Sequence, residues 1–269
     1  MTPAVSILMP VFRPDLGYLA EAIESVLAQT LAEWELVLVE DPSGTPLDAL
    51  LARWPDVRIR YHRRNGQRSL AAALNDGIAL CSAPMVARLD SDDLCAPERL
   101  ERQLAYLSTH PDVDVIGSSL TIINERGVRI GHRQLPTTAP GVAAALRRFN
   151  CVAHPSVMFR KEVVRDCGGY DPAVAIEDYD LWCRLSSAGR QIANLPEELL
   201  RYRYHSGALK FESVHHVIRE TIRTKRRYFA NSLTMGDRLR IAGEYSLLAL
   251  PPRVVLRLFR LFEYGASSK

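Results

Sequence analysis

The chain has 269 residues and a mass of 30.1 kDa. Hydrophobic residues make up 47% and charged residues 24%, a composition typical of globular proteins that excludes a disordered or fibrous chain. The sequence contains no run of roughly 18 uncharged apolar residues, which a transmembrane helix would need, and residues 1–4 lack the basic start of a secretory signal. Five cysteines without a CxxC pair argue against a disulfide framework or a zinc cluster, and predict reduced thiols in the cytoplasm.

The net charge of +3 is unevenly distributed along the chain. Residues 1–200 contain 20 Lys and Arg against 26 Asp and Glu, whereas residues 201–269 contain 14 against 5. Within residues 253–262, arginines recur at helical spacing among apolar residues, which is typical of a basic helix on an anionic membrane surface. Two interpretations of residues 250–269 stay open: peripheral docking on the inner face of the membrane, or packing against the body or a second subunit. The oligomeric state is left open.

The first part of the chain alternates strand-like apolar runs with segments of helical periodicity. Residues 5–9 read as a buried strand that stops at Pro10, and residues 16–28 place apolar side chains on one helical face. Such repeats with short connections predict a parallel sheet covered by helices on both faces. The expected strands are 5–9, 35–39, 57–61 and 84–89, and the expected helices are 16–28, 46–53 and 68–80.

The pattern is less regular after a predicted helix near residues 97–108. A loop at residues 168–171 leads to a helix that starts near Glu177. Residues 213–262 are expected to be helical, with a break at Pro251 and Pro252. Further strands are predicted at 113–117, 119–123 and 154–159.

Polar residues follow three of the early strands, at 10–13, 40–41 and 90–93. In parallel sheets, ligands bind beyond the carboxyl ends of the strands. This coincidence in place is the first indication of a functional site.

The segment Asp90-Ser91-Asp92-Asp93 is the sharpest feature of the sequence. Its three carboxylates repel one another and are costly to desolvate without a cation, and Mg²⁺ or Mn²⁺ would relieve that repulsion. The alternative is a solvated turn in which Asp93 caps the next helix. His205 is a further candidate for metal or phosphate, and Arg88 for a diphosphate, although a lone histidine or a surface arginine more often has neither role.

Two acidic pairs add to this cluster. Glu40 and Asp41 follow the second strand, where a carboxylate can accept hydrogen bonds from a base or a ribose; the alternative is an Asx-type turn. Glu177 and Asp178 are expected at a helix N-terminus, either with a general base that faces a metal-held leaving group or merely as partners of the helix dipole.

These clusters, in this order, resemble the family 2 glycosyltransferases, enzymes of the GT-A fold, over roughly three quarters of the chain. The first loop differs, because the family usually carries Tyr-Asn where this chain has Phe12-Arg13. The matching segments are 5–12, 22–30, 35–41, 71–79, 87–93, 154–160, 168–171 and 177–182.

The resemblance implies an α/β fold of GT-A type, a Rossmann-like and mostly parallel central sheet with helices on both faces, plus a helical C-terminal tail. It implies that Asp178 deprotonates the acceptor hydroxyl and that Asp90 and Asp92 form the DxD element, with Asp92 the direct ligand of the cation. The residues assigned on this basis are Asp178 and Glu177 to catalysis, Pro10, Val11, Phe12, Glu40, Asp41, Arg88 and Asp90 to the nucleotide sugar, and Asp92, Asp90 and His205 to the metal.

We therefore expect an inverting glycosyltransferase that uses a nucleoside-diphosphate sugar, a divalent metal (Mn²⁺ or Mg²⁺) and a saccharide or lipid-linked acceptor, in cell-envelope polysaccharide or glycolipid assembly. One alternative is a sugar nucleotidyltransferase, although residues 10–14 lack its glycine-rich loop; another is a non-catalytic nucleotide- or saccharide-binding scaffold. A nucleic-acid partner is not expected, because no basic-aromatic platform is evident.

The expected domain organisation has two parts. A glycosyltransferase domain spans residues 1–210, with a nucleotide-binding half at 1–95 and an acceptor half at 96–210. A basic helical extension follows at residues 211–269.

Overall fold

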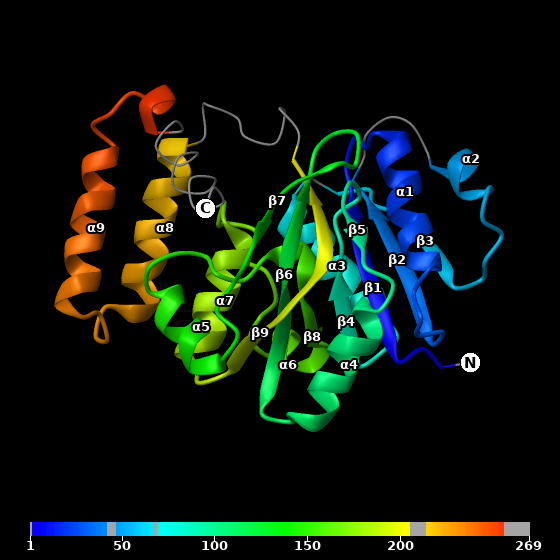
Figure 1. The fold of residues 1–269 in the computed structure, drawn as a ribbon, viewed down its shortest axis with the longest axis horizontal. Helices are drawn as coiled ribbons and strands as arrows, with labels where there is room; N and C mark the ends of the chain where they lie inside the picture. The colour runs from blue at the N-terminus through cyan, green and yellow to red at the C-terminus, as the bar shows by residue number, and fades with distance from the viewer. Residues whose placement is uncertain (1, 42–46, 67–68, 205–213, 256–269) are drawn as a thin grey trace.

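The described residues form a central sheet of nine strands (Figure 1). The strand order is β3-β2-β1-β4-β8-β6-β9-β5, and β7 pairs with β6 beside this path. The computed structural model describes residues 2–41, 47–66, 69–204 and 214–255.

The first half of the chain folds as its alternating pattern predicts. β2, β1 and β4 are parallel neighbours, and β3 extends the same parallel array on the far side of β2. This half comprises β1 (Val5–Val11), α1 (Leu16–Leu27), β2 (Trp34–Glu40), α2 (Asp48–Leu51), β3 (Ile59–Arg63), α3 (Leu70–Leu80) and β4 (Met85–Arg88).

The strand β1 is buried on both of its faces. Ile7 and Met9 belong to one apolar core, and Leu8 belongs to a second core on the opposite side of the sheet. The strand continues through Pro10 to Val11, beyond the predicted end. Pairing with β4 stops at Leu8, so the missing N–H of Pro10 costs no hydrogen bond on that side.

The second half of the chain adds antiparallel strands. β8 pairs antiparallel with both β4 and β6, while β9 lies parallel to β6 and antiparallel to β5. The elements are β5 (Leu94–Cys95), α4 (Arg99–Thr109), β6 (Val113–Ile123), β7 (Arg129–Arg133), α5 (Ala139–Leu146), η1 (His154–Ser156), β8 (Met158–Arg160), α6 (Lys161–Asp166), α7 (Glu177–Ser187) and β9 (Gln191–Arg203).

Two predictions in this half need correction. The strands expected at 113–117 and 119–123 are one strand, β6, with register shifts near its middle. The strand expected at 154–159 starts as a 3₁₀ turn, η1, because Pro155 suits the first turn of a helix and lacks the N–H that a ladder needs.

The chain then forms a helical hairpin, α8 (Val214–Phe229) and α9 (Met235–Leu247). α8 packs on α7, and α9 is outermost, at the left of Figure 1. The sequence places the break at 251–252 and misses the turn before α9, where Thr234 and Asp237 form a capping box. Among the described residues, no helix has both the length and the apolar character to cross a membrane.

Candidate active site

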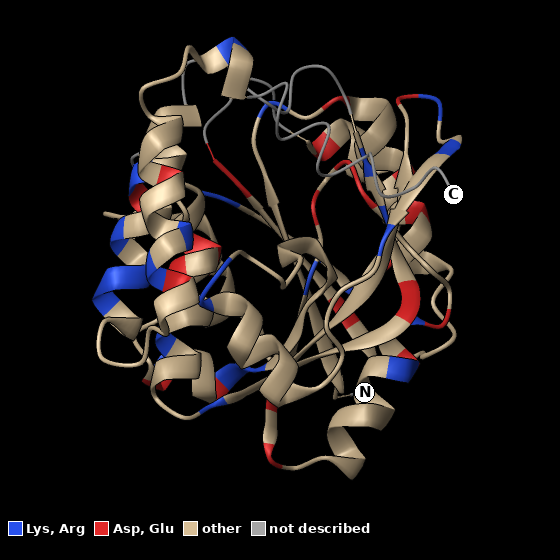
Figure 2. Cartoon of the chain, turned by 60° about the vertical axis from the view of Figure 1, so that its left-hand side comes forward, with Lys and Arg blue, Asp and Glu red and all other residues tan. Residues whose placement is uncertain are grey.

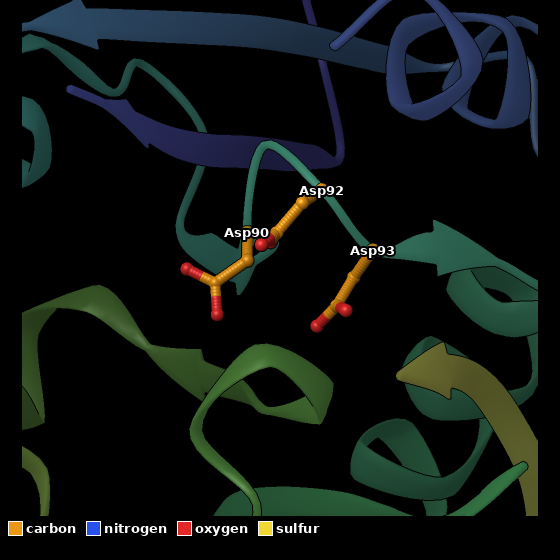
Figure 3. A group of neighbouring side chains, drawn as sticks. All are labelled: Asp90, Asp92 and Asp93. Atoms are coloured by element: carbon orange, nitrogen blue, oxygen red, sulfur yellow. The ribbon is translucent and has the colours of Figure 1, made fainter. Parts of the chain in front are cut away.

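The aspartate turn, Asp90 to Asp93, links β4 to β5 at the carboxyl end of β4 (Figure 3). Asp90, Asp92 and Asp93 each offer a carboxylate oxygen, and the three oxygens lie within 4.8 Å of one another. Asp93 does not cap the next helix, because α4 begins at Arg99 with Glu98 in the N-cap position. The capping alternative is therefore wrong.

Arg203, the last residue of β9, holds this turn. Its backbone N–H donates to Asp93 Oδ1 at 2.7 Å, and its Nε donates to the carbonyl oxygen of Asp92 at 2.9 Å. Burial and the charges of Asp90 and Asp92 raise the pKa of Asp93 well above its usual value. Asp93 Oδ2 is buried and has no hydrogen-bond partner among the described residues. Oxygen ligands this close, with one unsatisfied, fit a hard divalent cation.

Arg88 forms a buried ion pair with Asp90. Nη1 donates to Asp90 Oδ2 at 2.6 Å, and Nη2 donates to Oδ1 in a bidentate arrangement. Burial raises the pKa of Asp90 above its usual value, although the positive charge of Arg88 opposes this shift. Arg88 is 3% exposed and its guanidinium binds Asp90, so it anchors the turn in this structure. Its contact with a diphosphate stays a prediction.

Glu177 and Asp178 occupy the N-terminus of α7, where the sequence places them. Asp178 accepts one hydrogen bond from Asn150 Nδ2 and one from the backbone N–H of Tyr179, each at 2.7 Å. Burial raises the pKa of Asp178 despite these two bonds. Burial, and next the charge of Asp178, raise the pKa of Glu177 to about 7.

The structure brings the two distant acidic groups together around Arg88. The negative charge of Asp178 raises the pKa of Asp90, and that of Asp90 raises the pKa of Glu177. The positive charge of Arg88 acts on Asp90, Glu177 and Asp178 alike. Residues more than 80 positions apart therefore share one electrostatic environment.

Two further side chains, His154 and Tyr170, lie beside these acidic residues, and the sequence alone does not single them out. His154 Nε2 lies 2.9 Å from the hydroxyl oxygen of Tyr170, and its Nδ1 lies 4.0 Å from Glu177 Oε1. Burial, and next the charge of Arg88, lower the pKa of His154 well below its usual value. Its only sequence signal is its place in the segment 154–160.

Glu40 and Asp41 lie at the carboxyl end of β2 and are almost fully buried. Glu40 accepts a hydrogen bond from the hydroxyl of Tyr61. Asp41 forms an ion pair with Arg64 and accepts from the backbone N–H of Ser69 at 3.0 Å, so it joins β2 to the start of α3. Residues 42–46 lie outside the described residues, so the Asx-turn alternative stays open.

The end of β1 contributes Pro10 and Val11, both buried, and half-buried Phe12. Arg13 follows with a φ of 45°, a left-handed conformation that arginine rarely adopts, and its guanidinium lies 5.3 Å from the centre of the Phe12 ring. The predicted metal candidate His205 lies outside the described residues.

Comparison with known proteins decides the family. The model for glycosyl transferase family 2 matches residues 6–168. The chain belongs to this family. Among its relatives, the amylovoran biosynthesis glycosyltransferase AmsE of Erwinia amylovora is 37% identical over 190 residues, which cover 69% of this chain and 70% of AmsE. The O-antigen biosynthesis glycosyltransferase WbnJ of Escherichia coli is 32% identical over 86% of this chain and 92% of WbnJ.

The fold of this family member also matches a solved structure. The mannosyltransferase PcManGT of Pyrobaculum calidifontis, determined with GDP-Man and Mn²⁺, superposes with a TM-score of 0.66 at 15% identity, over 100% of this chain and 77% of PcManGT. The GT-A fold predicted from the sequence is thereby confirmed. Family membership supports a glycosyltransferase over the nucleotidyltransferase and scaffold alternatives.

Proposed function

We propose that this family member is an inverting, metal-dependent glycosyltransferase that moves a sugar from a nucleoside-diphosphate sugar to an acceptor hydroxyl. The observation that carries the proposal is the meeting of two acidic groups around Arg88: Asp90, Asp92 and Asp93 on one side, and Glu177 and Asp178 on the other. The first group is suited to binding a cation and, through it, a diphosphate. The second group is suited to accepting a proton.

Asp178 is the proposed general base. Its carboxylate takes the proton of the acceptor hydroxyl while the hydroxyl oxygen forms a bond to the anomeric carbon. The bond from that carbon to the diphosphate oxygen breaks on the opposite face, and the electron pair leaves with the diphosphate. The raised pKa of Asp178 increases its basicity, and the hydrogen bond from Asn150 fixes its orientation.

Asp92 and Asp90 are the proposed ligands of Mn²⁺ or Mg²⁺, with His205 a further candidate. A divalent cation there supplies positive charge where the leaving diphosphate gains negative charge. The Mn²⁺ in the PcManGT structure supports the use of a divalent cation. Asp93 Oδ2, which is buried and has no hydrogen-bond partner in the described part of the chain, adds a third oxygen to the same turn.

The nucleotide is proposed to bind along the carboxyl ends of β1 and β2. Asp41 would contact the base, with Glu40 behind it, while Pro10, Val11 and Phe12 would line the pocket. These segments occupy neighbouring strand ends, where Asp41 N–H donates to the Val11 carbonyl at 2.9 Å.

The proposed acceptor is a saccharide or a lipid-linked saccharide, in cell-envelope polysaccharide or glycolipid assembly. The names of AmsE and WbnJ, which refer to amylovoran and O-antigen biosynthesis, support this class. Residues 250–269 are proposed to dock on the anionic inner face of the membrane; of these, 256–269 lie outside the described residues. The division into residues 1–210 and 211–269 stays a prediction.

Donor turnover tests the proposal. Asp178→Asn and Asp92→Ala should each abolish transfer, with unfolding transitions close to that of the wild type. Asp166→Asn is the matched control, since this carboxylate is 64% exposed and lies on α6. NMR of the product anomer tests inversion. Wild-type transfer by both site variants, or a product that keeps the donor configuration, contradicts the proposal.

A further inference from the structure

The outward face of α9 has an unusual composition for a surface helix. Met235 and Leu239 are 75% and 67% exposed, and Ala242 and Ser246 continue the same row at helical spacing. This row contains no acidic residue. A helix on a globular protein normally turns its polar side outward, and α9 presents apolar and small side chains instead.

The acidic residues of α9 point inward and are already neutralised. Asp237 is 3% exposed, accepts from the Thr234 hydroxyl and pairs with Arg148 Nε at 3.1 Å. Glu244 accepts from the fully buried Lys225 at 2.6 and 2.8 Å. The two acidic side chains of α9 therefore form ion pairs within the protein.

Positive charge remains on the outside of the hairpin. Residues 214–255 carry eight Lys and Arg against three Asp and Glu, and Figure 2 shows basic residues gathered along the two C-terminal helices. Arg238 is exposed beside the row of Met235 and Leu239, and Arg253 is exposed beyond the helix. Neither forms an ion pair with any residue in the described part of the chain.

We propose that the outward face of α9, formed by Met235, Leu239, Ala242 and Ser246 and flanked by Arg238, docks on an anionic phospholipid surface. Exposed apolar side chains insert at the boundary of headgroups and acyl chains, and arginines bind the anionic headgroups. None of these residues belongs to the segment 250–269 or to the proposed catalytic residues, so this proposal can be tested independently of the proposed function.

The test measures binding of the full chain to phosphatidylcholine vesicles with and without phosphatidylglycerol. The wild type should float with the anionic vesicles and stay behind with the neutral ones. Met235→Gln/Leu239→Gln should lower the partition coefficient at least about tenfold, since it removes two insertable side chains. Arg238→Gln should lower it about fivefold.

The matched control is Val57→Gln/Val128→Gln, which removes two exposed apolar side chains, 95% and 57% exposed, from other parts of the molecule. It should bind vesicles like the wild type. Melting temperature and donor hydrolysis in solution should be the same for all variants. Equal binding by Met235→Gln/Leu239→Gln and the wild type overturns the proposal, as does equal binding to neutral vesicles.

Two other occupants of this face have distinct outcomes. If a second copy covers it, sedimentation shows a dimer that Met235→Gln/Leu239→Gln dissociates, while vesicle binding is unaffected. If residues 250–269 alone bind the membrane, their deletion abolishes flotation that Met235→Gln/Leu239→Gln leaves intact. Either result overturns the proposal for α9.

Discussion

Replacement of Arg203 by Met should weaken the attachment of the aspartate turn to β9 and leave only the backbone N–H of residue 203 on Asp93. The side chain is fully buried and carries three hydrogen bonds: Nε to the Asp92 carbonyl at 2.9 Å, Nη1 to the Glu125 carbonyl at 3.1 Å, and Nη2 to Glu21 at 2.5 Å. Its guanidinium also lies 4.2 Å from the centre of the Tyr18 ring. Methionine keeps most of the apolar stem and removes all of these contacts.

The expected loss of unfolding free energy follows from these partners. Hydrogen bonds from a charged donor contribute about 1.5–3 kcal/mol each, and two of the three go to backbone carbonyls. The pair with Glu21 adds less than about 1 kcal/mol, because that carboxylate is 51% exposed and regains water. The stack on Tyr18 adds about 1 kcal/mol. The variant also avoids the cost of burying the guanidinium, which offsets part of these losses. We therefore expect the free energy of unfolding to fall by about 3–5 kcal/mol.

Urea unfolding measures this loss, provided that the variant and the wild type have the same m-value. Calorimetric titration with Mn²⁺ measures whether the turn still binds a cation. Arg201→Met is the control, because Arg201 lies two residues earlier on β9, is exposed, and donates only to the Gly127 carbonyl among the described residues. Its loss should stay below about 1 kcal/mol. The loss of stability of Arg203→Lys should lie between those of Arg203→Met and Arg201→Met, because one ammonium group cannot reach three separated acceptors. If Arg203→Met and Arg201→Met lose the same stability, Arg203 does not hold the turn.

Three further predictions concern backbone strain, packing and pH. Arg13→Gly should raise the unfolding free energy by about 1 kcal/mol, because glycine adopts the φ of 45° without strain; a lower melting temperature would contradict this. Gly77→Ala should destabilise by about 2 kcal/mol in urea unfolding, since its Cβ would lie 2.2 Å from Leu8 Cδ1; an unchanged midpoint would show that the core yields. The pKa of Glu177 is about 7 in the folded state against 4.5 in the unfolded state, so between these values the folded state binds more protons than the unfolded state. The free energy of unfolding should therefore fall by up to about 3 kcal/mol as the pH rises from 4.5 to 7. Glu177→Gln should reduce this pH dependence in thermal melts across the same range.

Most of the first half of the fold could be predicted because β1 and β2 are buried on both faces and α1 and α3 each bury an apolar face. β1, β2 and α1 show these periods directly, within one or two residues of their observed ends. β7 could not be predicted, because four of its five residues are exposed and carry no alternation. β9 could not be predicted either, because Pro196 and two glutamates interrupt its apolar pattern opposite the register shifts of β6.

The candidate site divides in the same way. Asp90, Asp92, Glu177 and Asp178 could be singled out because acidic clusters beside apolar segments are costly without a function. Arg203 could not, since its importance comes from the place where β9 ends, which only the packing of the complete sheet determines. The contacts of Asn150 with Asp178 and of Tyr170 with His154 likewise cannot be predicted from local sequence spacing.

The position of β9 has a consequence for how the protein matures. β9, the last strand of the described residues, inserts between β6 and β5, and Arg203 at its end binds Asp92 and Asp93, which precede it by more than 100 residues. During synthesis, the nascent chain can assemble β1 to β4, with Arg88 on Asp90, before Arg203 binds the other two aspartates. Competence to bind a cation should therefore arise late, in a single step, when the final strand docks.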